Sequence, residues 1–194
     1  LAGAAAVLTK SPGILLFVSY LLWIKLEWLR TKKLDFRVLP IFLIPMAGLG
    51  LFWLYQIRMG DFWAYFNSGD NIHLQFWPFR IFDSAQAWVG SHWLEDVLWI
   101  YLVSAVGVWM AFKRSRVFGL FGLVYLASIL FVSHRDIARY SLPLVPVVLI
   151  GLSDVLKHKA VRWILVLLLI PCYFYTVNFV NFNYSPIADW APFL

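Results

Sequence analysis

Long apolar runs, separated by short polar segments, dominate the chain. A helix that crosses the hydrocarbon core of a bilayer needs about 20 apolar residues. After an apolar stretch at 1–8, runs of about this length lie at 12–29, 38–57, 93–112, 117–133, 141–156 and 161–180. The pattern predicts an all-α fold: a polytopic transmembrane helix bundle with about six full spans and a truncated helix at the N-terminus.

The composition favours the same interpretation. Hydrophobic residues make up 62% of the 194 residues and charged residues only 13%, whereas a soluble domain is about 45–50% apolar and about 25% charged. A small soluble domain keeps much of its surface in water and could not hide this excess. Many of the 11 Trp and 9 Tyr lie near the ends of apolar runs, as in the aromatic belts of membrane proteins. The only cysteine, Cys172, excludes a disulfide within the chain and a cysteine metal cluster.

Basic residues are divided unequally between the two sides of the predicted bundle. Together with the adjoining ends of the runs, the segments after 12–29, 93–112 and 141–156 hold 11 basic and 3 acidic residues, and the rest of the chain holds 5 basic and 7 acidic residues. The positive-inside rule places the first set in the cytoplasm, and the C-terminus outside or in the periplasm. We expect a multi-pass integral membrane protein, most simply of a bacterial plasma membrane. Topology accounts for the net charge of +6, so no nucleic-acid partner is expected.

The first external feature is Lys10, at the junction between the stretch 1–8 and the first full run. A lysine at the membrane interface can meet a lipid phosphate as a point charge. The alternative is a lysine that extends to the interface from a helix end. Pro12 suits the first turn of the next helix.

The second feature is the segment 58–92, which we expect to be an external interfacial segment. Gly60 and Asp61 can begin a short helix, with the carboxylate near its N-terminus. Three aromatic residues then share one helical face: Phe62, Tyr65 and Phe66. Such a helix lies on the membrane rather than through it. The aromatic residues of 71–80 suit sugar rings or lipid chains, and they equally suit plain anchoring at the interface.

Two pairs within or next to this segment resemble half of a metal site. Asp70 and His73 are three residues apart, and His92 and Asp96 are four apart. Two ligands are too few, and nothing supplies the others at motif spacing. We therefore expect no metal and no cofactor.

The third feature is a short external turn between two apolar runs. Five of its side chains are ionisable or phenolic: His134, Arg135, Asp136, Arg139 and Tyr140. Charge so near a bilayer is costly unless it is paired or hydrated, and it indicates function. The two arginines would share a helical face and suit a phosphate or pyrophosphate. The alternative is an ion-pair cluster that closes the helix hairpin. Two prolines after the turn, Pro143 and Pro146, can open a cavity between helices.

Three short motifs resemble those of polytopic C-type glycosyltransferases. The segment 8–13 (LTKSPG) resembles the "LTK-x-P" or "LTR-x-x-G" step of aminoarabinose and mannosyl transferases. Gly60-Asp61 with Ala64 resembles the "GD-x-x-A" step of the bacterial relatives of the second GPI mannosyltransferase. The segment 139–146 (RYSLPLVP) resembles the "RY-x-LP-x-x-P" step of the same group. The resemblance covers most of the chain in layout.

The resemblance implies transfer of a sugar from a polyprenyl-phosphate donor on the external face. Lys10 matches the basic residue that faces the lipid phosphate in the aminoarabinose branch, and Arg139 and Tyr140 match the step near the donor. Asp61 matches less closely. The family's catalytic carboxylate lies in an N-terminal half, so the catalytic residue is unknown here. We expect the chain, as one transmembrane domain over 1–194, to be the C-terminal part of a longer protein whose missing N-terminal half is a partner.

Two other functions stay open. A transporter or flippase of lipid-linked intermediates should carry charge in the middle of its spans and matching broken helices. The spans here are nearly free of charge, which favours chemistry at the interface. In a non-catalytic membrane scaffold, His134, Arg135 and Arg139 would serve stability only.

Overall fold

The structure is a computed structural model that describes residues 1–33, 35–68, 74–83, 85, 93–134 and 137–182. It divides into two compact units, Leu1–Leu152 and Ser153–Leu194. The α-helices of the first unit are α1 (Ala2–Thr9), α2 (Leu15–Thr31), α3 (Leu43–Met59), α4 (Ala64–Asn67), α5 (Trp93–Arg114), α6 (Arg116–Leu130), α7 (Ile137–Ser141) and α8 (Val145–Gly151). Its 3-10 helices are η1 (Ser11–Ile14), η2 (Phe36–Phe42), η3 (Arg80–Phe82) and η4 (Leu142–Leu144). The second unit holds α9 (Ser153–Lys157) and α10 (Lys159–Phe182).

The predicted all-α fold is confirmed. Among the described residues the only β-type pairing is an isolated bridge between Leu74 and Val132. Four helices are long and apolar enough to cross a membrane: Ser11–Thr31, Phe36–Met59, Glu95–Arg114 and Lys159–Val177. Two shorter apolar helices, Arg116–Leu130 and Ile137–Gly151, overlap the predicted runs 117–133 and 141–156. These helices are consistent with an integral membrane protein.

The helix of the predicted run 141–156 is interrupted several times. After α7, the run forms η4 and then α8, and the residues that follow α8 form α9. Pro143 lies at the start of η4 and Pro146 at the start of α8. Proline has no N–H to donate and its ring clashes with the preceding turn, so each proline begins a helical piece rather than continuing one.

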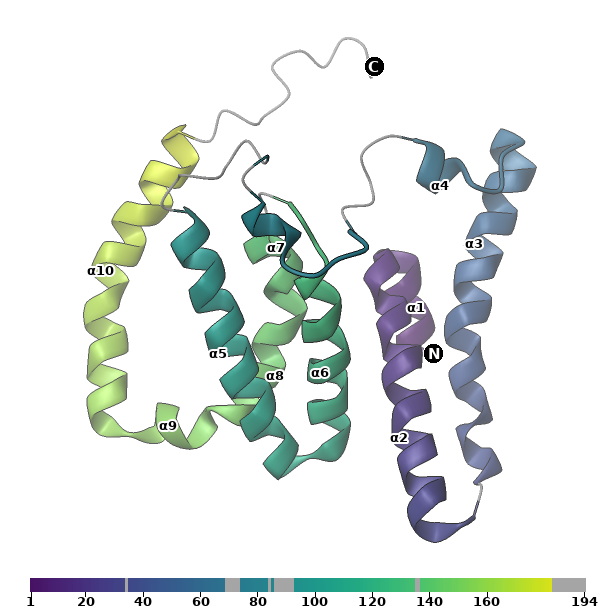
Figure 1. Ribbon diagram of the computed structural model, residues 1–194, viewed down its shortest axis with the longest axis horizontal. Coiled ribbons are helices and arrows are strands. Elements are labelled where there is room, and N and C mark those ends of the chain that lie inside the picture. Colours follow the sequence, from purple (N-terminus) through teal and green to yellow (C-terminus); the bar gives the residue numbers. More distant parts are fainter. Residues whose placement is uncertain (34, 69–73, 84, 86–92, 135–136, 183–194) are drawn as a thin grey trace. The chain divides into compact units, whose positions relative to one another are not determined.

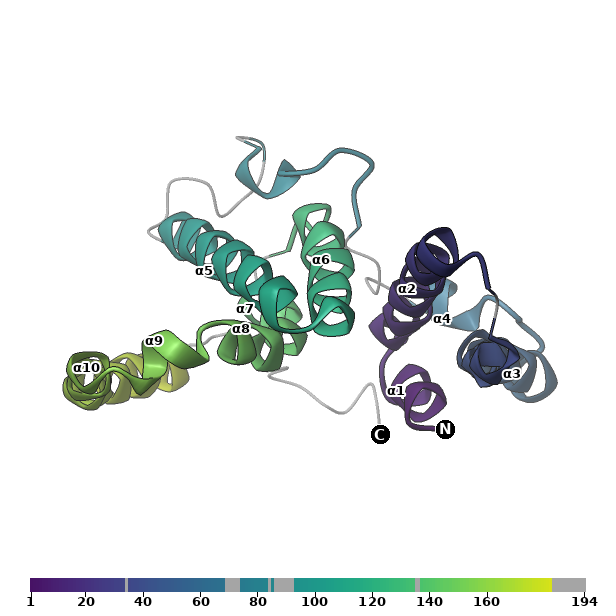
Figure 2. The ribbon, with the colours of Figure 1, turned by 90° about the horizontal axis from the view of Figure 1, so that it is seen from below.

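The core of the first unit lies among α5, α6 and α8, which Figure 2 shows close together in a view along the helices. Buried apolar side chains from these helices form one cluster, which also contains Ile81, Ile137 and Leu144. Helices α5 and α8 approach at glycines. A Cβ on Gly107 would lie 2.7 Å from a methyl of Val148, and a Cβ on Gly151 would overlap the carbonyl oxygen of Gly107. Small residues permit such close crossings of helices in membranes.

A tight reversal joins α1 to α2. Figure 1 shows α1 beside α3, and α2 continuing from the same end of α1 past α6. The reversal occurs at Lys10 and η1, where Pro12 takes the first turn as expected. A Cβ on Gly13 would lie 2.5 Å from the carbonyl carbon of Ala6. The reversal therefore needs glycine at this position, and it fixes Lys10 at the end of the bundle.

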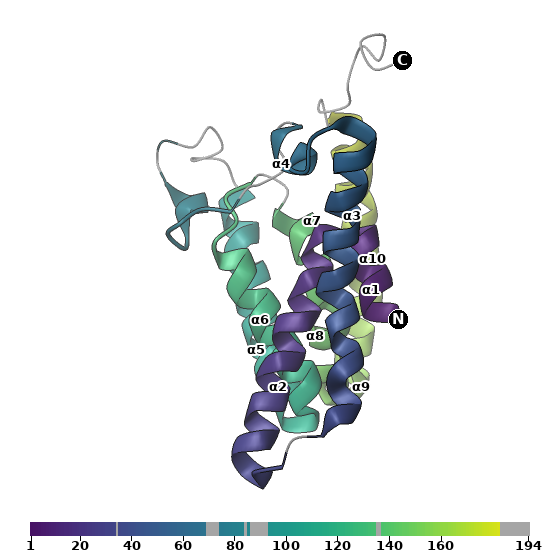
Figure 3. The same cartoon turned by 90° about the vertical axis from the view of Figure 1, so that its right-hand side faces the viewer.

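Part of the predicted interfacial segment closes one end of the bundle. The backbone N–H of Gln75 donates to the carbonyl of Phe131 at 2.7 Å, and that of Phe79 donates to the carbonyl of Leu130 at 2.8 Å. Ile81 is completely buried. The segment 74–82 thus pairs with the C-terminal end of α6 and inserts a side chain into the core. Earlier in the segment, α4 lies by the C-terminal end of α3, as Figure 3 shows.

The second unit consists of α9 and the long apolar helix α10. Large side chains of α10 are exposed over the whole described length, from Trp163 at 60% to Tyr175 at 63%. A helix satisfies its own backbone hydrogen bonds, so an apolar helix of this kind is stable when lipid surrounds it. The turn between α9 and α10 holds the basic residues Lys157 and Lys159.

Candidate functional site

Three of the predicted site residues meet at the end of the first unit. The ammonium nitrogen of Lys10 lies 5.6 Å from the ring centroid of Tyr140. The ring of His134 lies 5.4 Å from that of Tyr140, edge to face. A cation held over an aromatic face is attracted by the ring quadrupole. We call Lys10, His134, Arg139 and Tyr140 the outer cluster.

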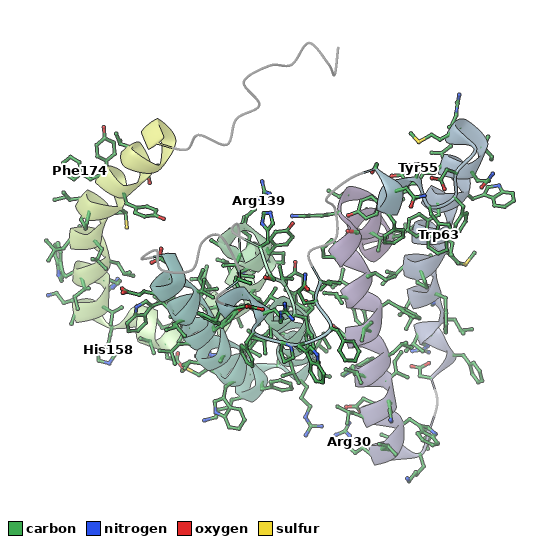
Figure 4. All side chains as sticks on the ribbon, turned by 45° about the horizontal axis from the view of Figure 1, so that its top comes forward. Arg30, Tyr55, Trp63, Arg139, His158 and Phe174 are labelled. Carbon is green, nitrogen blue, oxygen red and sulfur yellow. The ribbon has the colours of Figure 1, made fainter. Side chains whose placement is uncertain are left out.

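Arg139 belongs to the outer cluster through its position on α7. It precedes Tyr140 in the last turn of this short helix, and its side chain is exposed. Figure 4 shows Arg139 projecting from the end of the bundle that carries α7. Arg135 and Asp136 lie outside the described residues, so the predicted pair of guanidinium groups stays a prediction. The cluster presents at least two cations, from Lys10 and Arg139, on one end of the unit.

A hydrogen bond joins η1, which directly follows Lys10 of the outer cluster, to α4. The hydroxyls of Ser11 and Tyr65 lie 3.0 Å apart. Ser11 directly follows Lys10, and Tyr65 lies in α4. The contact brings the predicted interfacial helix to the lysine junction, which sequence spacing alone did not reveal.

Asp61 has a local role in the structure. Its Oδ1 accepts a hydrogen bond from the backbone N–H of Trp63, and its Oδ2 accepts one from the side-chain amide of Asn67, both at 2.8 Å. Both carboxylate oxygens thus hold the turn into α4, as an Asp at the start of a helix commonly does. These are its hydrogen bonds among the described residues, and none reaches the outer cluster.

An aromatic group joins α4 to α3. The ring of Phe52 on α3 lies 5.5 Å from Phe62, 6.0 Å from Trp63 and 5.6 Å from Phe66. Phe62 and Phe66 therefore pack on a helix of the bundle, while Tyr65 points to Ser11. Figure 4 shows Tyr55 and Trp63 in this region. The predicted common helical face of Phe62, Tyr65 and Phe66 is not formed, because Phe62 precedes α4 and Tyr65 contacts Ser11. The sequence also did not reveal Phe52, because nothing local distinguishes it from other apolar residues of its run.

An apolar groove lies along α2, α6 and the broken segment η4–α8. Its volume is about 220 Å³. Its lining comes from α2, α6 and the broken segment η4–α8: Leu16, Ser19, Tyr20, Val117, Phe118, Phe121, Pro143, Pro146, Val147 and Ile150. The prolines do line a cavity between helices, as expected. Sequence reasoning did not predict the part of the lining on α2. The one signal in the sequence was the polar Ser19, whose hydroxyl donates to the carbonyl of Leu15 at 2.8 Å.

The groove and the cluster lie on the same two stretches of chain. Leu16 follows Lys10 by six residues, and Pro143 follows Tyr140 by three. From these residues the lining runs away from the cluster, to Ile150 in α8 and to Val117 and Phe118 at the start of α6. One end of the groove is therefore close in sequence to the cations, and the groove extends from there toward the other end of the unit.

Two buried hydroxyls near this end have no hydrogen-bond partner among the described residues. They belong to Ser133, which precedes His134, and to Tyr101 on α5. Phe79 and Phe82 of the segment that closes the bundle lie 6.2 Å and 6.4 Å from the Tyr101 ring. Buried polar groups are nearly always satisfied, so these two mark polar positions beneath the outer end. Sequence reasoning missed Tyr101, which looks like any aromatic residue of its run.

The two suggested metal half-sites fall mostly outside the described residues. Asp70, His73 and His92 lie outside the described residues, and Asp96 lies in the first turn of α5. Within the described ranges no group of three His, Cys, Asp or Glu residues is placed to hold a metal ion.

The outer cluster with its groove is thus the arrangement that best fits an amphiphilic anion. Comparison with the models of known protein families, with curated proteins and with solved structures finds no match to the chain.

Proposed function

We propose that the chain is part of a membrane-embedded, inverting glycosyltransferase that takes a sugar from a polyprenyl-phosphate donor and transfers it to an acceptor on the external face. Its six apolar helices would all cross the membrane, with the outer cluster outside. The observation that carries the proposal is that Lys10 and Arg139 precede the first groove-lining residues, Leu16 and Pro143, by six and four residues. A polyprenyl phosphate has one anionic group and a long apolar chain, and the two parts of the site match these two chemistries.

Lys10 and Arg139 would hold the phosphate. Lysine binds phosphate as a point charge and arginine through paired N–H donors. The groove would take the isoprene units nearest the phosphate, because transfer of their apolar surface from water or headgroups to an apolar wall is favourable. Tyr140 would keep the Lys10 ammonium in place over its ring. His134 packs against the same Tyr140 ring.

In the transfer step, the acceptor hydroxyl oxygen attacks the anomeric carbon of the sugar. The bond from that carbon to the phosphate oxygen breaks, and the lipid phosphate leaves with the bonding electrons. Negative charge on the phosphate rises as the bond breaks, so fixed cations stabilise the transition state more than the ground state. The hydroxyl proton passes to a base, which contributes about 10²–10⁴-fold; no residue of this chain is assigned that role.

Arg139→Ala tests the proposal in the full-length protein. We expect loss of transfer of labelled mannose or aminoarabinose from its polyprenyl-phosphate donor, with unchanged expression. Arg58→Ala is the matched control, because Arg58 is also exposed and lies in the last turn of α3, on the same predicted side. Equal activity of Arg139→Ala and the wild type would argue strongly against the phosphate site.

A flippase for the same lipids is the second candidate, and the broken helix α7–η4–α8 favours it, since broken helices line transport paths. The two functions differ in what they need. A flippase moves a fluorescent polyprenyl-phosphate sugar across liposomes without any acceptor, whereas a transferase consumes the donor only when an acceptor is present. If the purified protein does neither and Arg139→Ala alters only its stability, the scaffold alternative is correct.

A further inference from the structure

The opposite end of the first unit carries a second, separate feature. There α2 ends and the chain turns into η2, and an open hollow of about 590 Å³ lies between the two elements. Its lining is Trp23, Ile24, Glu27, Trp28, Thr31, Lys33, Asp35, Arg37 and Val38. Figure 4 shows Arg30 at this end of α2, at the far end of the helix from the outer cluster. We call the hollow between α2 and η2 the basic hollow.

Several contacts hold the end of α2 beside the basic hollow. Lys32 takes a left-handed conformation with φ of 56° and ends α2, its N–H donating to the carbonyl of Trp28 at 2.7 Å. The ammonium of Lys32 lies 5.7 Å from the Trp28 ring. The N–H of Lys33 donates to the hydroxyl of Thr31 at 3.2 Å. These contacts hold Lys32 and Lys33 at the end of α2.

Cations outnumber anions around the hollow, and the anions are already engaged. Between 25 and 37 the sequence has five basic residues and two acidic ones: Lys25, Arg30, Lys32, Lys33 and Arg37, against Glu27 and Asp35. Glu27 pairs with Arg30 at 2.6 Å. Asp35 accepts the backbone N–H of Arg37 at 2.9 Å and so caps η2. In the described part of the chain, Lys33 and Arg37 form no ion pair.

The walls of the hollow are apolar where they continue along α2. Trp23 and Ile24 lie about two turns before the end of α2, and Val38 lines the hollow from η2. Nearby apolar side chains such as Leu29 on α2 and Phe36 on η2 are exposed, at 45% and 71%, and suit a surrounding of lipid. A free phosphate ion would use the cations but not these walls. A phospholipid uses both, with its headgroup at the cations and its glycerol and upper chains on the tryptophans.

From this arrangement we infer that the basic hollow is a binding site for the headgroup of an anionic phospholipid of the leaflet at this end, with Lys33 and Arg37 as its phosphate ligands. Basic pockets between helices on the cytoplasmic side of membrane proteins bind such headgroups, and each nearby Lys or Arg adds to the attraction. The site is distinct from the outer cluster and does not depend on the proposed transfer reaction.

The test measures lipid retention by the full chain in neutral detergent by native mass spectrometry, with phosphatidylglycerol and phosphatidylcholine as competing probes. The wild type should prefer phosphatidylglycerol. The variant Lys33→Gln/Arg37→Gln should lose about 30-fold of that preference, the loss expected for removal of two cations. The control Arg116→Gln/Lys159→Gln removes the same charge from exposed positions in the other two basic turns and should keep it.

Several outcomes would overturn the inference. They are no preference in the wild type, an equal loss in the control, and displacement of phosphatidylglycerol by millimolar inorganic phosphate, which would indicate a free-phosphate site. Should the double variant fail to fold, phosphatidylglycerol with a diazirine in its upper chain is cross-linked to the wild type. Labelling of the peptide 23–38 supports the site, and labelling only elsewhere rejects it.

Discussion

Replacement of Lys10 by glutamine is expected to weaken the binding of a polyprenyl phosphate by about 10- to 100-fold, the loss typical of a hydrogen bond to a charged group. Lys10 occupies the junction where α1 reverses into η1, and its ammonium lies over Tyr140 from a distant part of the sequence. Glutamine keeps most of the side-chain length but removes the charge, so the loss reports the charge rather than the packing.

The measurement is binding of a fluorescent polyprenyl phosphate to the protein in nanodiscs of phosphatidylcholine. Lys113→Gln is the control, because the ammonium of Lys113 also lies over an aromatic ring, that of Trp109 at 5.9 Å. Lys10→Arg should recover most of the affinity, since arginine binds phosphate as well. A wild-type affinity in Lys10→Gln, or an equal loss in Lys113→Gln, would show that Lys10 does not hold the lipid phosphate.

Gly151→Ala is expected to destabilise the first unit by roughly 3 kcal/mol, at the upper end of the usual cost of overpacking. A Cβ at this position would overlap the carbonyl oxygen of Gly107 and lie 3.0 Å from the backbone N of Ala111. Both obstacles are backbone atoms of α5, which cannot rotate away as a side chain can. Helices α5 and α8 would have to separate along their contact, which also carries buried Val147 and Val148 of the core.

Unfolding in mixed micelles of increasing dodecyl sulfate, followed by circular dichroism, measures this effect. Gly50→Ala is the matched control, since a Cβ on Gly50 of α3 meets nothing within 4 Å. There alanine should leave stability unchanged or raise it by up to about 1 kcal/mol, because alanine favours the helix over glycine. If Gly151→Ala unfolds at the same dodecyl sulfate fraction as Gly50→Ala, the close crossing of α5 and α8 is wrong.

The length of the apolar runs predicted the four helices that are long and apolar enough to cross a membrane. A run near 20 residues with almost no charge has few options other than a helix in lipid, because only a helix satisfies its own backbone groups there. The same reasoning identified the charged turns at which function was expected. It was less successful with the run 141–156, since the prolines indicated a bend but not the division into η4, α8 and α9.

For the candidate site, the sequence identified candidate residues but could not assign their roles. Lys10, Asp61, His134, Arg139 and Tyr140 were chosen from the sequence because each is polar beside an apolar run. Spacing could not distinguish Asp61, whose oxygens hold its own turn, from Lys10, which reaches Tyr140. A carboxylate near a helix start has the same local pattern whether it binds its own backbone or a ligand.

The sequence by itself determined that the chain is helical, with apolar runs long enough to cross a membrane, which turns are charged, and which polar residues lie beside the apolar runs. Those properties follow from local composition and from the bilayer's demand for satisfied backbone groups. The tertiary structure decided which polar residues meet: Lys10 with Tyr140, Ser11 with Tyr65, and the α2 face that completes the groove. These contacts join residues far apart in the chain, and they depend on packing at glycines and prolines that no local pattern specifies.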